Sequence, residues 1–584
     1  MQFVNDMAMK KLILIMLLLS IFVPLSAKVV TSAEAESIAA AFFESKPHKS
    51  VSRQLKRALR SNFSDNQSVS EYYIYNNGEN DGFVIVAGDS NISPILAYSD
   101  TGSFDWNNLP PNLEEWLSQM KVYVKAMSRA DKGASETISK PEAKVLYETA
   151  EWGQNYPFNA RCPLDGTTRT LTGCTATSFA ILLRYFEYPY SGHNVTESYS
   201  YVDAAGNNIT IGSESLSGPF HWDDMPLKYS TSWTQDNIEA VSEIMYICSV
   251  SAKAAFGVKE TPGNTYQCHK VLQTNLDYDK ASLYHRRSWY SDGEWISRVI
   301  AHLDKIGPLL YSANSKEGGH SFIVDGYDSE MNFHINWGWK GYMNGYFAFP
   351  AWLSYRYDHQ AAFGVQPDRG GKPEPFLSLS NSWDCKGITL DGIDEVVEND
   401  NFTIKCGFLK IESVSTAFRG YVSAAVIDKS DRLKEFISKE NVVNLDAGYG
   451  YSAYSINCKI SKDIEVGDRI TLFQRRENDT TWNRVPFDRE HVVGELPISD
   501  LQTIEETTSL SYDVEGNVLT LELKDAVRYS LDLAGVPYLS GISEEDVPVR
   551  IDVSDLPLGN YDLCLAKKRE TVHLKLNMGG KKDE

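Results

Sequence analysis

The chain lacks the patterns that mark zinc sites and nucleic-acid binding. Its eight cysteines form no Cys-x-x-Cys pair, and no histidine stands at zinc-finger spacing, so we expect no metal ion. Basic clusters are also missing, and the formal charge of −22 would repel a phosphate backbone. No nucleic-acid partner is therefore expected. The cysteines are predicted to be small buried residues or occasional pairs, because a large core needs no disulfide framework.

Long apolar runs are scarce as well, with one exception near the N-terminus. Lys10 and Lys11 precede an apolar run from Leu12 to Leu25, which ends in Ser26-Ala27. About 14 residues are too few for a membrane span, which needs about 20, but they fit a signal peptide. We expect residues 1–27 to be removed and the rest to be exported to an extracellular, periplasmic or cell-surface location, with no transmembrane segment left.

The composition is typical of folded protein. Hydrophobic residues make up 42% and aromatic residues 12% of the 584 positions, which fits roughly three or four domains of about 150 residues. Residues 28–140 are predicted to form a small α+β unit that ends in a polar, cleavable linker. Its expected elements are a helix at Thr31–Phe43 capped by Ser32, strands at Tyr72–Tyr75 and Phe83–Ala87, a helix at Leu113–Met127 and the linker at Arg129–Lys140.

Glycine, proline and charged residues at 368–375 mark a break in the chain. We expect further domains at 141–367, 376–500 and 501–584. The last two are predicted to be one or two all-β, sandwich-like domains, because short strands recur between turn residues. The expected strands include Phe402–Lys405, Gly420–Ile427, Val518–Leu523 and Tyr529–Leu533.

Cys174 is the best candidate nucleophile. Apolar residues recur at helical spacing from Ala176 to Phe186 and Pro189 ends the run, so Cys174 is expected at the start of a buried helix. Unpaired N–H groups and the helix dipole at that position favour a thiolate. Gly173 would let another part of the chain come close.

His320 is the predicted general base. Two glycines precede it, and the apolar residues after it alternate as in a strand that turns at Asp328–Glu330. The next strand returns through Asn336 and Trp337. Asn336 is therefore expected to accept the imidazole N–H, and Trp337 to shield that hydrogen bond from water.

Two residues are second choices for these roles. Cys162 precedes Pro163, which favours extended backbone rather than a helix start. His334 has the same strand parity as His320 and Asn336 but lacks the preceding glycines. Each candidate also has a structural explanation when taken singly, as a buried cysteine, a surface histidine or a turn asparagine. Their conjunction in this order favours a catalytic site.

Several longer motifs stand in order along the chain. They are Glu151-Trp-Gly-Gln-Asn-Tyr-Pro-Phe-Asn159, Thr172-Gly-Cys-Thr-Ala-Thr177, Arg184-Tyr-Phe-Glu-Tyr-Pro189, Gly319-His-Ser-Phe-Ile-Val-Asp-Gly326 and His334-Ile-Asn-Trp-Gly-Trp339. In these motifs the chain resembles the streptopain family of secreted bacterial papain-like cysteine proteases. Upstream, Gly82-Phe-Val-Ile-Val-Ala-Gly-Asp89 and the segment 95–105 are similar to the inhibitory propeptide of that family.

The resemblance implies a papain-like α+β protease domain at 141–367, preceded by the propeptide at 28–140. The site residues that it implies are Cys174 as nucleophile, His320 as proton acceptor, Asn336 and Trp337 as orienting and shielding residues, and Gln154 as the side-chain donor of the oxyanion hole. The 146 residues from Cys174 to His320 fall within the roughly 130–150 typical of papain-like enzymes. No metal or organic cofactor is implied, and no substrate-binding residue is assigned.

The expected function is that of a secreted cysteine endopeptidase, made as a zymogen and inhibited by its own propeptide, that cleaves proteins through a thioester acyl-enzyme. Two alternatives stay open. A Cys/His amidase acting on cell-wall peptides would use the same chemistry. A surface binding protein would instead carry its function on the C-terminal β domains, beside a decayed protease module. The segment Leu531-Asp-Leu-Ala-Gly535 resembles a sorting domain of Bacteroidetes secretion.

Overall fold

The computed structural model describes most of the chain after residue 28. The described residues are 29–46, 55–59, 70–109, most of 113–124, 145–498 apart from 315–317, 349–356, 394–395, 397–398, 463, 466 and 490, and strands between 511 and 578. The expected signal peptide and the linker at 129–140 lie outside them. Below, residues 29–124 are the N-terminal unit, 145–367 the central unit and 376–498 the β-sandwich.

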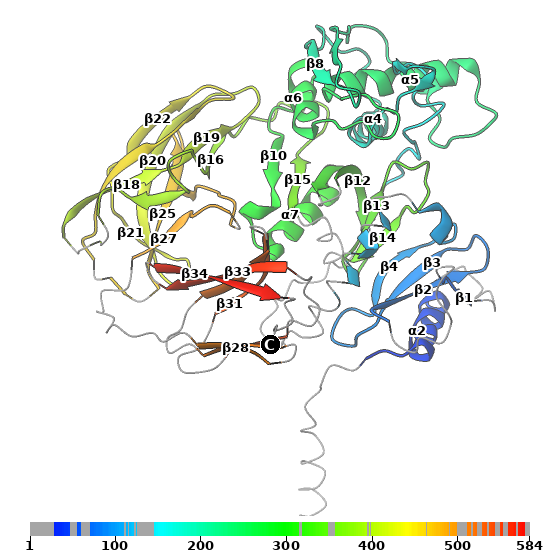
Figure 1. Cartoon of the computed structure of the whole chain (residues 1–584). Helices are drawn as coiled ribbons and strands as arrows, with labels where there is room; N and C mark the ends of the chain where they lie inside the picture. Colours follow the sequence, from blue (N-terminus) through cyan, green and yellow to red (C-terminus); the bar gives the residue numbers. More distant parts are fainter. Residues whose placement is uncertain are drawn as a thin grey trace, which may run out of the picture.

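One antiparallel sheet joins the N-terminal and central units. Its strands follow the order β1-β2-β3-β4-β14-β13-β12-β11-β15-β10, with β5 beside β12. β4 pairs with β14 through Tyr98↔Tyr346 and Ala97↔Phe347, so the two units share a strand pairing (Figure 1). These strands are β1 (Leu55–Arg57), β2 (Tyr72–Asn77), β3 (Phe83–Ala87), β4 (Ile95–Ser99), β5 (Val145–Leu146), β10 (Leu283–Arg286), β11 (Leu309–Asn314), β12 (Gly319–Tyr327), β13 (Asn332–Asn336), β14 (Gly345–Ala348) and β15 (Tyr357–Phe363).

Helix α2 (Ser32–Glu44) packs on β2 and β3 in the N-terminal unit. The Thr31 side chain accepts a hydrogen bond from the Glu34 N–H, and the Glu34 carboxylate accepts one from the Thr31 N–H. This reciprocal capping box makes Thr31 the cap, so the prediction of Ser32 was wrong by one residue. The described residues between 113 and 124 are helical, in agreement with the predicted second helix. A 3-10 turn, η1 (Trp106–Asn108), lies between these helices in the chain.

Four α-helices are described in the central unit. They are α4 (Cys174–Phe186), α5 (Gln235–Ser251), α6 (Thr265–Asn275) and α7 (Asp292–Lys305), accompanied by 3-10 turns η2 (Trp222–Asp224) and η3 (Arg287–Trp289) and by the hairpins β6–β7 (Leu164–Asp165, Thr168–Arg169) and β8–β9 (Tyr199–Val202, Asn208–Ile211). Helix α4 packs between α5 and β12 and is buried from Thr175 to Leu183. The apolar spacing after Cys174 therefore forms the buried helix that it predicts.

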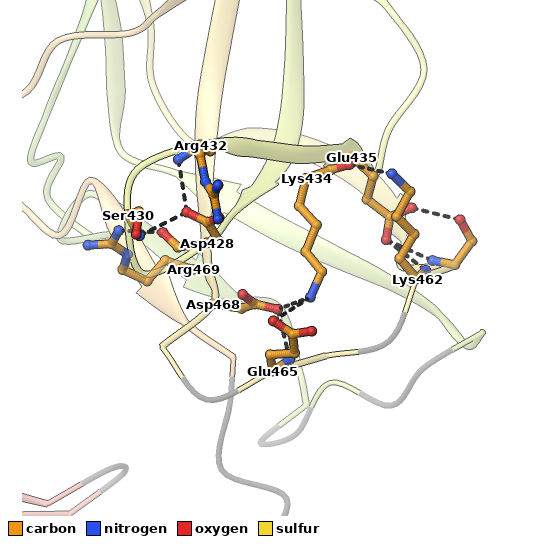
Figure 2. Close-up of polar contacts among 10 residues, drawn as sticks. Asp428, Ser430, Arg432, Lys434, Glu435, Lys462, Glu465, Asp468 and Arg469 are labelled. Atoms are coloured by element: carbon orange, nitrogen blue, oxygen red, sulfur yellow. Dashed lines mark hydrogen bonds and ion pairs between the residues drawn. The ribbon is translucent and has the colours of Figure 1, made fainter.

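The β-sandwich has its own apolar core. Its strands are β16 (Phe376–Ser380), β17 (Ile388–Leu390), β18 (Asn401–Cys406), β19 (Phe408–Glu412), β20 (Phe418–Ile427), β21 (Leu433–Phe436), β22 (Asn441–Leu445), β23 (Gly450–Tyr451), β24 (Tyr454–Lys459), β25 (Arg469–Arg476), β26 (Asn483–Arg484) and β27 (Glu495–Pro497). Figure 2 shows polar contacts at turns between its strands. Lys434 Nζ lies 2.8 Å from the buried Asp468 carboxylate, and the Asp428 carboxylate accepts hydrogen bonds from the backbone N–H groups of Ser430 and Arg432.

The last part of the chain is described as backbone strands. They are β28 (Ser511–Glu515), β29 (Val518–Glu522), β30 (Arg528–Leu533), β31 (Val536–Ile542), β32 (Val549–Asp552), β33 (Gly559–Lys567) and β34 (Glu570–Met578). An α+β central unit, with a small α+β unit before it and all-β structure after it, is the predicted fold class. Within the described part of the chain, no helix combines the length and apolar character of a membrane span.

Candidate active site

Cys174 is the first residue of α4, and Gly173 is the cap of that helix. Gly173 has φ +88°, and a Cβ atom there would lie 2.2 Å from the backbone oxygen of Thr261. Only glycine therefore allows this loop to pass directly over the start of the helix, as the sequence predicts. The Cys174 side chain is partly exposed, whereas the other six described cysteines are buried, and none of these seven forms a disulfide.

His320 lies on β12, with 2% of its surface exposed. Its Nε2 is 3.0 Å from the backbone oxygen of Trp337. Because a carbonyl oxygen only accepts, Nε2 carries the proton in this bond and Nδ1 is left as the basic nitrogen. Burial lowers the pKa of His320 to about 4, although the bond to Trp337 acts in the opposite direction. The imidazole is therefore neutral at neutral pH.

Cys174 and His320 line the same cavity, which has a volume of about 480 Å³. Burial raises the pKa of the Cys174 thiol, and hydrogen bonds from the backbone of Ser321 and from Thr175 act in the opposite direction. Ser321 follows His320 on β12, so its hydrogen bond holds the thiol against the strand that carries the imidazole. Burial thus opposes the charged form of both the thiol and the imidazole.

Asn336 does not make the predicted hydrogen bond to His320. Its Nδ2 donates to Thr149 Oγ1 and to the Ala150 oxygen, both at 2.9 Å, and its Oδ1 accepts the Gly338 N–H at 3.1 Å. The two N–H donors of the Asn336 amide thus hold the start of the central unit, and its oxygen holds the turn after Trp337. The expected acceptor for the imidazole is replaced by the backbone carbonyl of the next residue.

Trp337 lies beside His320 as predicted, with ring centroids 5.9 Å apart and 2% of its surface exposed. Trp339 is closer, at 5.2 Å from the imidazole, and stacks on Trp337 at 5.4 Å. The sequence interpretation missed Trp339, although it stands two residues along in the same motif. The two indoles together cover the imidazole.

His334, the second-choice base, is held in a different network. Its Nδ1 is 2.5 Å from the carboxylate of Asp325, which is 2% exposed. The other Asp325 oxygen accepts a hydrogen bond from Thr149 at 2.5 Å, and Thr149 in turn accepts from Asn336. His334 is therefore a partly buried structural partner of the buried Asp325, and neither of them lines the cavity.

Gln154 lies next to the start of α4. Its backbone oxygen accepts the Thr172 N–H at 3.1 Å, two residues before Cys174. Among the described residues its side-chain amide has no hydrogen-bond partner, and Gln154 does not line the cavity that contains Cys174 and His320. Cys162, the weaker candidate nucleophile, is 1% exposed, and burial raises the pKa of its thiol to about 12. Such a thiol is inert at neutral pH.

The cavity has charged residues that the sequence interpretation did not single out. Arg286 from β10 lines it, and so do Lys410 and Glu412 from β19 of the β-sandwich. No sequence signal connects residues more than 200 positions from Cys174 to its surroundings, because their approach depends on how two units dock. Within the described residues, no three His, Cys, Asp or Glu side chains converge as metal ligands would.

Curated relatives cover different parts of the chain. PrtT of Porphyromonas gingivalis, a thiol protease/hemagglutinin, is 27% identical over 529 residues, which are 84% of this chain. The chain spans 58% of the length of that relative. Streptopain of Streptococcus pyogenes serotype M28 is 29% identical over 304 residues, which are 49% of this chain and 75% of streptopain.

A solved structure and two family models complete the comparison. A prointerpain A fragment of Prevotella intermedia is 25% identical with a TM-score of 0.46 and covers 55% of this chain and 99% of the fragment. The Peptidase C10 family model matches residues 152–347, and the Spi protease inhibitor model matches residues 27–124. Residues 152–347 of this chain are therefore a Peptidase C10 family domain, and residues 27–124 before them are a Spi protease inhibitor domain.

Proposed function

We propose that the chain is an exported cysteine endopeptidase made as a zymogen, with Cys174 as nucleophile and His320 as general base. One observation carries the proposal. The thiol at the start of α4 and the imidazole on β12 line one cavity, and Ser321, the residue after His320, lines it as well. A nucleophile and a base that line the same cavity are the minimum that acyl transfer requires.

The proposed chemistry is acyl transfer by a thiol that an imidazole activates. His320 Nδ1 takes the proton of the Cys174 thiol as sulfur attacks a peptide carbonyl, which forms the C–S bond and places negative charge on the carbonyl oxygen. The Gln154 amide and the Cys174 backbone N–H are proposed to donate to that oxyanion. The imidazolium then protonates the leaving amine as the C–N bond breaks. Water, deprotonated by His320, hydrolyses the thioester and restores the thiol.

Asn336 and Trp337 are proposed as positioning residues rather than as groups that touch substrate. The Trp337 carbonyl fixes Nε2 as the protonated nitrogen, which leaves Nδ1 as the base. Asn336 supports that carbonyl indirectly, because it bonds to Gly338 on the far side of Trp337 and to Ala150. The buried indole keeps water away from the imidazole.

The N-terminal unit is proposed to keep the enzyme latent by holding β14. Trp116 of this unit packs edge-on against Phe347 at 5.3 Å, and Phe347 packs against Trp337 at 5.2 Å. This chain of rings runs from the N-terminal unit to the residue that bonds to His320. We propose that cleavage in the linker at 129–140 frees β14 and lets the Trp337 turn adjust. On this account residues 28–140 are the propeptide and 141–367 the protease domain.

The remaining domain boundaries that we propose come from the sequence. Residues 1–27 are proposed as a signal peptide that directs export, and 376–500 and 501–584 as separate β domains, the last one related to sorting. Protein or peptide substrates are proposed because the comparisons identify a peptidase domain preceded by a protease inhibitor domain.

Expression of the chain without residues 1–27, as wild type and as Cys174→Ala, tests the function. The wild type is expected to lose about 12 kDa, as roughly 110 residues predict, and then to hydrolyse casein. Cys174→Ala should stay full length and inactive. Equal casein hydrolysis by both chains would refute the assignment, and hydrolysis of peptidoglycan without casein would favour the amidase.

A further inference from the structure

The active-site cavity has a wall that the peptidase domain does not supply. Lys410 and Glu412, both on β19 of the β-sandwich, line the cavity that contains Cys174 and His320. Residues 152–347 match the peptidase family, so this wall lies outside the matched segment. The cleft is therefore built from two units of the chain.

Two contacts join the surroundings of β19 to the central unit, one from the neighbouring strand β16 and one from the residues that follow β19. The Phe376 ring packs against His285 at 5.3 Å and against Trp289 at 5.7 Å, edge to face. Ser415, three residues after Glu412, donates to the Gln273 side chain of α6 at 2.9 Å. Apolar and polar contacts of this kind hold the β-sandwich against the central unit.

The two charged side chains that β19 contributes to the cavity differ in how far they are exposed to solvent. Lys410 and Glu412 form an ion pair at 2.9 Å, in which the lysine side chain is 33% exposed and the glutamate side chain 9%. Glu412 also accepts a hydrogen bond from Ser378 at 2.6 Å. Both contacts are to Oε1 of a carboxylate that is largely buried, whereas the more exposed ammonium has N–H donors left for a ligand.

Arg286 adds a second cation on the same cavity. Its side chain is 38% exposed and pairs with Asp358 at 3.3 Å, but Asp358 itself does not line the cavity. Among the described residues, the ionisable groups that line the cavity are Cys174, His320, Arg286, Lys410 and Glu412, together with the tyrosines Tyr266 and Tyr284. Two cations and one largely buried carboxylate thus line the described part of the cavity, on a chain whose formal charge is −22.

We propose that β19 forms one wall of the substrate cleft and that Lys410, with Arg286, selects peptides carrying an acidic side chain at a position near the scissile bond. The inference rests on the proposed peptidase function and adds a substrate preference to it. A peptide Asp or Glu entering the cleft gains a charge-assisted hydrogen bond, whereas a Lys or Arg meets like charge.

The test compares cleavage of a peptide library, with Glu, Gln or Lys at each position around the bond, by the processed full-length protein and its variants. Lys410→Glu reverses the exposed charge. The double variant Lys410→Glu with Glu412→Lys also reverses the charge at position 410, but it keeps an ion pair between the two positions. It therefore controls for a folding defect caused by loss of that pair. Lys405→Glu is the matched control: this β18 lysine is 43% exposed, pairs with Asp391 at 2.7 Å and does not line the cavity.

The wild type should prefer Glu over Lys at one position. Both charge-reversed proteins should lower the Glu-to-Lys ratio of kcat/KM by about tenfold, and the effect should weaken in high salt. Lys405→Glu should keep the wild-type ratio. If the wild type cuts the library but both reversed proteins keep its ratio, the proposed wall is wrong. If the processed wild type cuts no peptide at all, the peptidase function itself fails.

Discussion

The N-terminal unit and the β-sandwich flank the same central unit, but they are attached in different ways. The N-terminal unit extends the central sheet through the pairing of β4 with β14, and none of its described residues lines the active-site cavity. The β-sandwich is docked mainly by side chains such as Phe376 and Ser415, and it does line the cavity. The N-terminal unit thus contacts the central unit at a sheet edge, while the β-sandwich contributes residues to the cavity.

The strand junction explains how one proteolytic cut could have a large effect. An edge strand such as β14 is left with unpaired N–H and C=O groups once its neighbour leaves. Its residues reach the Trp337 turn through Phe347. A change at the edge therefore has a short physical route to the carbonyl that holds His320.

The largest effect is expected from breaking the junction at Tyr98. Its ring stacks on Tyr346 at 4.7 Å, Lys46 Nζ lies 3.7 Å from its centre, and its hydroxyl donates to Asp328 at 2.9 Å. Tyr98→Ala should weaken the attachment by about 3 kcal/mol or more, and so speed processing about 100-fold. The rate of propeptide loss, followed by gel, measures this.

Tyr98→Phe is the control for that change. It keeps the stacked ring and removes the bond to Asp328, so it should speed processing by about tenfold or less. Processing at the wild-type rate in Tyr98→Ala would contradict the view that the junction maintains latency.

A second difference between the units is that the described histidines with strongly lowered pKa values all lie in the central unit. Burial lowers the pKa of His269, His302 and His320 to about 4 and that of His285 to about 3, and all four lie in the central unit. The described residues of the N-terminal unit contain no histidine, and His491 of the β-sandwich is exposed. Acid should therefore destabilise the central unit before the β-sandwich.

His302 allows the direction and the magnitude of this pH-dependent loss of stability to be worked out. Its Nδ1 accepts the Gly364 N–H at 3.1 Å, so protonation breaks that bond. An unfolded histidine titrates near about 6.5. As the pH falls, the unfolded chain binds the proton before the folded chain does. The contribution of neutral His302 to the free energy of unfolding is therefore complete above about pH 6.5. It is lost as the pH falls toward 4, by about 3 kcal/mol. Calorimetry at about pH 7.5 and 4.5 should show a smaller loss in His302→Gln, and an unchanged loss in His491→Gln.

The smallest effect is expected at the side-chain contact of the β-sandwich. Phe376→Ala removes two aromatic contacts and should weaken docking by about 1–2 kcal/mol. Differential scanning calorimetry should then resolve separate transitions for the two units. Phe436→Ala, at a ring that is 38% exposed on the same β-sandwich, should leave the number of transitions unchanged. One unaltered transition in Phe376→Ala would mean that other contacts hold the units together.

Local patterns predicted much of the fold and part of the site. The helix start at Cys174, the closeness allowed by Gly173 and the strands around His320 follow from spacing and residue type in nearby sequence. The cap of α2 was missed by one residue because Thr31 and Ser32 have the same chemistry. The Thr31–Glu34 spacing is the signal that would have separated them.

The errors lie where the structure depends on distant residues. Asn336 was expected to bond to His320, but its partners Thr149 and Ala150 are 187 and 186 positions away. The junction of β4 with β14 and the place of Lys410 in the cavity also depend on how separate units meet. No periodicity along the chain encodes such contacts.

The most direct test of the central claim is to locate a thiol-directed epoxide inhibitor on the processed protein by peptide mass spectrometry. One label per chain, on Cys174, is expected, because the other described cysteines are buried. His320→Ala should label at least about 100-fold more slowly, since the neighbouring base is lost. Labelling spread over other cysteines, or equally fast labelling of His320→Ala, would contradict the assignment of Cys174 and His320 as the catalytic pair.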